Sequence, residues 1–334
     1  MVLVVLLAAA GSSALAIGLS LPWLQRYALA RPNARSSHAV PTPQGGGWAV
    51  VAATLALAGI GIAFGMVPAA TPAFGVIAGG ALALAVVSAW DDVRPLDARV
   101  RLAVHLATVA LALAVLAPGV RLFPDFVPAA IEWPILLLAG VWFVNLTNFM
   151  DGLDWLTVAE MLPVTLAIAA FGLWGVVDPL TTVLAAALAG GLIGFAPFNR
   201  PVARLFLGDV GAVPIGFLVA CLLFALAAAG EWAAALSLPL YYWADATITL
   251  LRRIARRERF WEAHRSHFYQ QAVANGFDAS RVARRVFGLN LALAALAAGT
   301  IGAQTLWVDL VALAIGGALV VACLFDFARP RAVS

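Results

Sequence analysis

The sequence of 334 residues contains no lysine, only two cysteines and a small share of charged side chains, 11% of the chain. The absence of lysine excludes every mechanism that depends on a lysine side chain. The two cysteines, Cys221 and Cys323, both lie in apolar runs, so the sequence offers no disulfide framework and no cysteine metal site. Soluble domains carry about 25% charged residues. With 63% hydrophobic residues, the composition predicts a polytopic membrane protein.

Eleven apolar runs are long enough to cross a bilayer, which takes roughly 17–25 residues per helix. They lie near residues 2–22, 46–67, 71–90, 101–118, 133–149, 157–177, 180–197, 210–229, 232–251, 286–304 and 306–325. The sequence therefore predicts an all-α membrane protein with one integral domain over residues 1–334. Basic residues follow the first run and do not precede it, a pattern that does not fit a cleaved signal peptide.

Arginine is distributed unevenly between the two sets of loops that connect these runs. One set carries nineteen of the twenty arginines, and the other carries only Arg121. Because positively charged loops stay on the cytoplasmic side, we expect the N-terminus outside and the C-terminus in the cytoplasm. The unusual polar sequence also gathers on the predicted cytoplasmic side. We expect an active site to be formed there by loops 23–45, 91–100, 150–156, 198–209 and 252–285.

The end of the run near 133–149 carries two amides and two carboxylates, Asn145, Asn148, Asp151 and Asp154, at intervals of three residues. Such spacing places them on one slowly drifting face of a helix. Polar groups at membrane depth are costly and usually face the protein interior or a water-filled cavity. The stretch therefore favours one wall of an active site. Asp154 could instead cap the following span, but capping does not explain the two asparagines inside the apolar run.

Two further acidic positions lie at the ends of spans on the same side. Asp91 and Asp92 end one run, where adjacent carboxylates suit Mg²⁺ or accept a proton, unless they only begin a solvated loop neutralised by Arg94. Asp209 lies between two glycines before another run and fits either a metal ligand or an ordinary N-cap. His105 could line the same cavity or be hydrogen-bonded within the bundle.

The first cytoplasmic loop contains His38, two prolines and the run Gly45-Gly46-Gly47. Prolines hold such a loop extended. Glycines let the backbone approach a ligand, here where a helix begins with free N–H groups that suit an anion. The segment is therefore either a phosphate-handling loop or a plain loop with a flexible helix start.

The loop after residue 251 is rich in arginine and contains His264, Arg265 and His267. Its first arginines are typical of anchors that contact lipid headgroups. The His264–His267 group suggests contact with an anion or pyrophosphate, since no further soft ligand is present to complete a zinc site. Asp245, inside the preceding run, could pair with an arginine. Together, carboxylates for Mg²⁺ and cationic groups for phosphate favour phosphoryl transfer in which one substrate is a lipid phosphate.

The five polar segments, in this order, resemble those of the polyprenyl-phosphate N-acetylhexosamine-1-phosphate transferase family. They read SSHAVPTPQGGG, DDVRPLDARVRLAVH, NLTNFMDGLDWL, NRPVARLFLGDVGAVPIGF and HRSHFYQ. The resemblance implies Mg²⁺-dependent transfer of a sugar-1-phosphate from a UDP-N-acetyl-sugar to undecaprenyl phosphate, with release of UMP. It also implies a site on the cytoplasmic face of the bacterial inner membrane and no nucleic-acid partner. A homodimer through lipid-facing spans would be unsurprising.

The resemblance implies roles for the matching residues as well. Asp91 and Asp92 resemble the acidic pair near the lipid phosphate, one of them as base or nucleophile. Asp209 looks like the Mg²⁺ ligand, with Asp151 as a second metal-facing residue. The expected substrate contacts are His38, Asn145, Asn148, Asp151, Asn199, His264, Arg265 and His267.

The sequence departs from the family pattern at Gln44, Trp155, Ala212 and His105, where arginine, glycine, serine and glutamine are frequent. The last motif lacks the triple histidine of the peptidoglycan translocase, phospho-N-acetylmuramoyl-pentapeptide transferase. This favours the branch that initiates O-antigen synthesis and leaves the translocase as the alternative. A lipid-phosphate transporter or flippase is an interpretation from another class. It would need polar residues across the bilayer, whereas the outer halves of the runs are nearly all apolar.

Overall fold

The computed structural model describes residues 1–30, 41–65, 67, 71–116, 121, 128–259 and 264–330. Within these residues the chain forms thirteen helices and one small antiparallel sheet. The helices are α1 (Val2–Tyr27), α2 (Gly47–Ala63), α3 (Thr71–Val93), α4 (Ala98–Leu116), α5 (Ala129–Met150), α6 (Leu156–Leu173), α7 (Pro179–Phe195), α8 (Asp209–Ala228), α9 (Trp232–Ser237), α10 (Leu240–Ala255), α11 (Phe268–Ala274), α12 (Ala279–Ala303) and α13 (Leu306–Ala328). The strands are β1 (Leu29–Ala30) and β2 (Thr42–Pro43).

The prediction of an all-α polytopic membrane protein is confirmed. Among the described residues, eight helices are long and apolar enough to cross a membrane (α1, α3, α4, α5, α6, α8, α12 and α13), and α2 and α7 are shorter apolar helices. The run expected near 232–251 forms two helices, because α9 ends at Ser237 and Pro239 precedes α10. Proline lacks the N–H that a continuous helix would need there. The number of spans and their orientation stay predictions.

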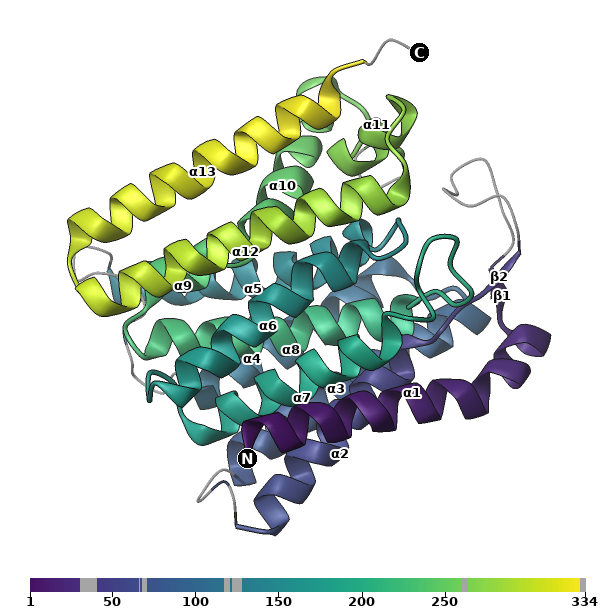
Figure 1. Cartoon of the computed structure of the whole chain (residues 1–334), viewed down its shortest axis with the longest axis horizontal. Helices are drawn as coiled ribbons and strands as arrows, with labels where there is room; N and C mark the ends of the chain where they lie inside the picture. Colours follow the sequence, from purple (N-terminus) through teal and green to yellow (C-terminus); the bar gives the residue numbers. More distant parts are fainter. Residues whose placement is uncertain are drawn as a thin grey trace.

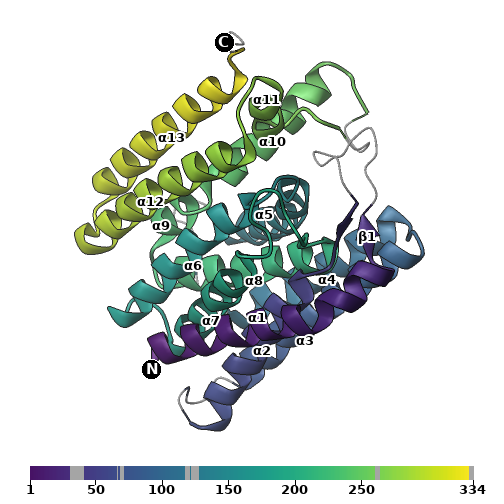
Figure 2. The same ribbon diagram turned by 45° about the vertical axis from the view of Figure 1, so that its right-hand side comes forward.

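Helix α8 lies at the centre of the bundle, where it packs against α2, α3, α4 and α5 (Figure 1). It is apolar on every face, as expected of a helix buried on all sides. Helix α1 packs along α7, and α7 packs on α2 and α6. The pair α12 and α13 lies at the opposite edge from α1 and α2 (Figure 2). The core is therefore a bundle of apolar helices around α8.

The crossing of α2 and α8 explains the run of three glycines. A Cβ atom at Gly47 would collide with the Cα of Gly211, and a Cβ at Gly211 would collide with the Cα of Gly47. Gly46 and Gly47 donate their N–H groups to the carbonyls of Phe206 and Leu207, each over 2.9 Å. These two N–H groups are therefore not free to bind an anion, as the phosphate-handling alternative would have them. Instead, they fasten the first loop to the start of α8.

The described parts of the predicted site loops lie at one end of the bundle, on the right in Figure 1. The C-terminal ends of α3 and α5 and the N-terminal ends of α4, α6 and α8 lie there, with the connection between α10 and α11. Hydrogen bonds join α4 to α3, α5 to α8 and α11 to the end of α5. The fold thus brings segments that are more than a hundred residues apart in the sequence to one surface.

Candidate active site

The C-terminal end of α5 forms one wall of the site. Asn145 donates from Nδ2 to the carbonyl of Val141 over 2.7 Å, and the same nitrogen lies 3.1 Å from Nδ1 of His105 in α4. His105 is buried. It is therefore hydrogen-bonded within the bundle, the second of the two alternatives left open for it. The Asn145–His105 pair joins α4 to α5 one helical turn before the next asparagine.

Asn148 connects this wall to the start of α8. Its Nδ2 donates to Oδ2 of Asp209 over 3.3 Å. Asp209 is the first residue of α8 and makes no capping bond, because the N-cap position is occupied by Gly208. Gly208 has φ +73°, and a Cβ there would also contact the backbone nitrogen of Gly45, so glycine is required. The N-cap alternative for Asp209 is wrong, and its carboxylate is directed to Asn148.

Asp151 follows the last turn of α5 and accepts a hydrogen bond from α6. The hydroxyl of Thr157 donates to its Oδ1 over 2.5 Å. Burial raises the pKa of the Asp151 carboxyl to about 7, the hydrogen bond from Thr157 opposes this rise, and the charges of Asp209 and Asp154 add to it. The carboxylates of Asp151 and Asp209 are therefore close enough to repel each other.

The acidic pair at the end of α3 divides into two different environments. Asp91 accepts hydrogen bonds from Arg101 at Oδ2 and from the N–H of Leu96 at Oδ1, each over 2.6 Å. Asp92 is exposed, and its charge interacts with those of Asp209 and Asp91. Asp91 is thus held in place by α4, whereas Asp92 is the accessible carboxylate beside Asp209.

The segment between α7 and α8 is fastened to the corner between α5 and α6. Asn199 is 8% exposed and uses both amide atoms on the backbone. Its Oδ1 accepts the N–H of Trp155 over 2.7 Å, and its Nδ2 donates to the carbonyl of Leu205 over 3.0 Å. Asp154 accepts the N–H of Ala203 over 2.9 Å. The N-cap position of α6 is occupied by Trp155 and not by Asp154, for which the sequence had left this alternative open. Asn199 orients the segment that leads to Asp209.

Trp155 stands where glycine is frequent in the family that the sequence resembles. It nevertheless adopts the backbone conformation that glycine favours. Its φ is +64°, in the left-handed region. The indole Nε1–H donates to the carbonyl of Ala196 over 2.7 Å. This bond and the N–H bond to Asn199 hold the tryptophan in a conformation that costs about 1–2 kcal/mol for residues with a Cβ.

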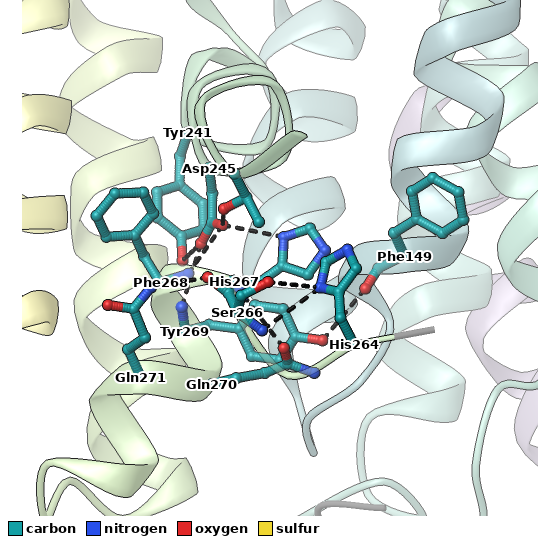
Figure 3. Close-up of polar contacts among 11 residues, drawn as sticks. Phe149, Tyr241, Asp245, His264, Ser266, His267, Phe268, Tyr269, Gln270 and Gln271 are labelled. Atoms are coloured by element: carbon teal, nitrogen blue, oxygen red, sulfur yellow. Dashed lines mark hydrogen bonds and ion pairs between the residues drawn. The ribbon is translucent and has the colours of Figure 1, made fainter. Parts of the chain in front are cut away.

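The loop that carries the two histidines is fixed by Asp245 (Figure 3). This carboxylate is 0% exposed. It lies 3.1 Å from Nδ1 of His267 and accepts the N–H groups of Phe268 and Tyr269 over 3.0 and 3.1 Å. The hydroxyl of Tyr241 also donates to it, over 3.2 Å. Among the described residues, Asp245 is therefore bonded to α10 and to the start of α11, and not to the arginine that the sequence allowed as its partner.

His264 stacks on His267, with ring centroids 4.9 Å apart, and its Nδ1 lies 2.8 Å from the hydroxyl of Ser266. Burial, followed by the neighbouring His267 and Arg253, lowers the pKa of His264 to about 4. The imidazole is therefore neutral at physiological pH. Arg265 is exposed beside it.

Tyr269 connects the histidine loop to the end of α5 (Figure 3). Its hydroxyl donates to the carbonyl of Phe149 over 3.1 Å. A Cβ atom at Gly152 would collide with this hydroxyl, which explains the glycine after Asp151. The loop with His264 and His267 is thus fixed beside the segment with Asn148 and Asp151.

The structure brings together most of the predicted site residues. Asn148 donates a hydrogen bond to Asp209, whose charge acts on Asp92 and Asp151. Tyr269 joins the loop with His264, Arg265 and His267 to the end of α5. His38 lies outside the described residues. The sequence did not indicate the roles of Thr157 and Tyr269, which are ordinary core residues by composition. For Asp245, a carboxylate inside an apolar run was a signal of function or of a specific partner.

The oxygen ligands of this region fit Mg²⁺. Within the described ranges, no three His, Cys, Asp or Glu side chains are arranged to hold a metal ion by themselves. Mg²⁺ commonly takes one or two protein carboxylates and completes its coordination with water and substrate phosphates. Asp209 and Asp151 supply two such carboxylates, and a divalent cation would relieve the repulsion between them.

The sequence is similar to a family of glycosyl transferases and to two kinds of sugar-phosphate transferase. Residues 74–227 match the model of glycosyl transferase family 4. The chain is 43% identical over 105 residues to the phospho-N-acetylmuramoyl-pentapeptide-transferase of Heliobacterium modesticaldum. The aligned residues make up 31% of this chain and 32% of the relative. It is 32% identical over 214 residues to the decaprenyl-phosphate N-acetylglucosaminephosphotransferase of Mycobacterium tuberculosis. This alignment covers 58% of this chain and 52% of the relative. The chain thus spans about a third to a half of the length of these relatives.

Proposed function

Because this chain belongs to the polyprenyl-phosphate hexosamine-1-phosphate transferase family, we propose that it transfers a sugar-1-phosphate from a UDP-N-acetyl-sugar to undecaprenyl phosphate. The products are undecaprenyl-diphosphate-sugar and UMP. One observation carries the proposal: the Asn148–Asp209 hydrogen bond joins α5 to α8 and gathers the carboxylates of Asp151, Asp209 and Asp92 at one end of a membrane bundle.

In the proposed reaction, a phosphate oxygen of the lipid forms a bond to the phosphorus attached to the sugar. The bond from that phosphorus to the bridging oxygen of the diphosphate breaks, and UMP leaves with this oxygen. A lipid phosphate is largely ionised at neutral pH, so a strong base is not required. Asp92 is the carboxylate that is accessible to the lipid phosphate, and Asp91 sets the position of Arg101, a cation suited to phosphate.

Asp209 and Asp151 would hold Mg²⁺. The cation would neutralise negative charge on the diphosphate, which is the main requirement of phosphoryl transfer. Asn148 fixes the Asp209 carboxylate, and Thr157 fixes that of Asp151. Neutral His264 can exchange hydrogen bonds with the diphosphate-sugar region without bringing a charge, while Arg265 supplies a permanent positive charge there.

An apolar cavity of about 90 Å³ between α5, α8 and α9 supports the lipid acceptor. Leu136, Phe143, Phe224 and Trp232 are among the residues that line it. Leu136 precedes Asn148 by three helical turns and one residue, or about 18 Å at the helical rise of 1.5 Å per residue. A prenyl chain whose phosphate lies near the end of α5 is long enough to reach this cavity.

The proposed pathway is the initiation of O-antigen or another cell-envelope polysaccharide, at the cytoplasmic face of a bacterial inner membrane. The HRSH motif, which lacks a triple histidine, favours this over the pentapeptide transferase reaction of peptidoglycan synthesis. Both kinds of enzyme are among the relatives. The pentapeptide transferase is therefore the second candidate, and the donor distinguishes the two.

The test is an assay of purified protein with undecaprenyl phosphate, Mg²⁺ and a panel of UDP-sugars, including UDP-N-acetylmuramoyl-pentapeptide. We expect release of UMP with at least one UDP-N-acetylhexosamine and none with the pentapeptide donor. UMP release with the pentapeptide donor alone would assign the second function. No UMP release with any donor would overturn the proposal.

A further inference from the structure

Two buried hydroxyl groups form a chain that ends on Asp151. Thr157, in the first turn of α6, is 2% exposed and donates to Oδ1 of Asp151 over 2.5 Å. Tyr242 of α10 is completely buried, and its hydroxyl donates to Oγ1 of Thr157 over 3.2 Å. The chain of donors therefore runs from α10 through α6 to the end of α5.

The direction of this chain follows from what each group can donate. A threonine hydroxyl has a single proton and can also accept. Because Tyr242 supplies a proton to Oγ1, the proton of Thr157 is directed to Asp151. Thr165, two turns further along α6, behaves in the usual way for a helical threonine and donates back to carbonyls of its own helix. Thr157 departs from this arrangement.

Helix α10 also sets the position of the histidine loop. Tyr242 and Asp245 lie three residues apart, so they occupy neighbouring positions on one helix. The backbone N–H of Tyr242 donates to Oε1 of buried Glu160 in α6 over 3.3 Å, which fixes α10 against α6. One helix therefore supports both the Asp151 carboxylate, through Thr157, and His267, through Asp245.

We propose that Thr157 and Tyr242 are positioning residues that orient the Asp151 carboxylate toward Mg²⁺ and the donor diphosphate. The inference rests on the proposed function. With Oδ1 engaged by Thr157, Oδ2 of Asp151 is the oxygen presented to a ligand. Groups that hydrogen-bond a metal ligand fix its orientation, and their loss commonly costs about 10–100-fold in metal affinity or activity.

The test compares Thr157→Val, Thr157→Ser and Tyr242→Phe with the wild type in detergent. Thr165→Val is the matched control, because it removes a buried hydroxyl from the same helix without touching Asp151. The first measurement is thermal unfolding during a Mg²⁺ titration without substrates. The second is kcat and KM for the UDP-sugar at saturating lipid.

We expect Thr157→Val to require a Mg²⁺ concentration about 10–100-fold higher than the wild type to reach half of the maximal rise in unfolding temperature. Its kcat/KM for the UDP-sugar should fall by a similar factor. Thr157→Ser keeps the hydroxyl and follows the wild type, and Tyr242→Phe lies between the two. Thr165→Val keeps the wild-type Mg²⁺ response.

The proposal is overturned if Thr157→Val keeps the wild-type Mg²⁺ response in an active enzyme. It is also overturned if Thr165→Val loses the response equally, because the hydroxyl of Thr157 would then matter only for packing in α6. If the wild type binds Mg²⁺ but transfers no sugar phosphate, the proposed function is contradicted. If Thr157→Val then loses the Mg²⁺ binding that the wild type shows, the positioning role is still supported. A wild type with neither turnover nor a Mg²⁺ response overturns both.

Discussion

Nδ1 of His267 lies 3.1 Å from Oδ1 of Asp245, at a depth where the carboxylate has no contact with solvent. The same carboxylate accepts the backbone N–H groups of Phe268 and Tyr269. A buried charge is tolerated only when such partners replace water. The position of His267 is therefore dictated by α10 and not by the loop that carries the histidine.

Replacing Asp245 by alanine leaves two buried N–H groups without an acceptor. We expect a loss of about 2–5 kcal/mol of stability and of nearly all activity, because the histidine loop loses its anchor. Thermal unfolding in detergent and UMP release measure the two effects. Asp309→Ala, in the first turn of α13, is the control and should change neither. Wild-type unfolding and turnover in Asp245→Ala would refute the anchor.

Two tryptophans at opposite ends of α6 provide a test of backbone strain. Trp155 has φ +64°, whereas Trp174 has φ −86°. Since a left-handed backbone costs about 1–2 kcal/mol for a residue with a Cβ, we expect Trp155→Gly to be more stable than Trp155→Ala by about 1 kcal/mol. At Trp174 the usual order applies, with alanine the more stable. The same order at both positions, measured by thermal unfolding, would be inconsistent with strain at Trp155.

Gly152 leaves no room for a side chain beside the hydroxyl of Tyr269. We expect Gly152→Ala to displace this hydroxyl from the carbonyl of Phe149, with lower stability and a loss of activity. Tyr269→Phe removes the colliding atom, so the double variant should recover part of the stability lost in Gly152→Ala. A double variant whose losses are the sum of the two single losses would show that the residues do not interact in this way.

The neutral state of His264 gives stability a defined pH dependence. Its pKa in the fold is about 4, against an ordinary value of 6.5. Between these values the unfolded chain binds more protons at this residue than the folded chain, so the contribution of His264 grows with pH and is complete above 6.5. We expect the difference in unfolding temperature between wild type and His264→Asn to change across this window and to stay constant at higher pH. If the difference in unfolding temperature still changes above pH 6.5, His264 is charged in the folded protein, which contradicts the prediction.

Local patterns predicted the parts of the site that lie on single elements. The spacing of Asn145, Asn148 and Asp151 placed them correctly along the end of α5, because helical periodicity is a local property. Runs of apolar residues likewise predicted the long helices, but not α11, which lies within the predicted loop 252–285. The break between α9 and α10 was missed, although Pro239 marks it, because the surrounding run is apolar throughout.

Roles that depend on packing between distant segments could not be predicted. Asn199 and Trp155 are 44 residues apart, and nothing near Asn199 indicates that its amide accepts the N–H of Trp155. The same holds for Thr157 and Tyr242, 85 residues apart. Composition marked Asp245 as unusual but could not identify its partners, since three of them, His267, Phe268 and Tyr269, lie more than twenty residues away in the sequence.

The central claim is that the phosphate attached to the sugar moves to the lipid together with the sugar. The direct measurement uses a UDP-N-acetylhexosamine that is radioactive in this phosphate, with undecaprenyl phosphate, Mg²⁺ and either the wild type or Asp209→Asn. The account predicts that the label enters the lipid fraction with the wild type, that unlabelled UMP is released, and that Asp209→Asn transfers almost none. Label that remains in water-soluble UDP while the sugar enters the lipid, or full transfer by Asp209→Asn, would contradict it.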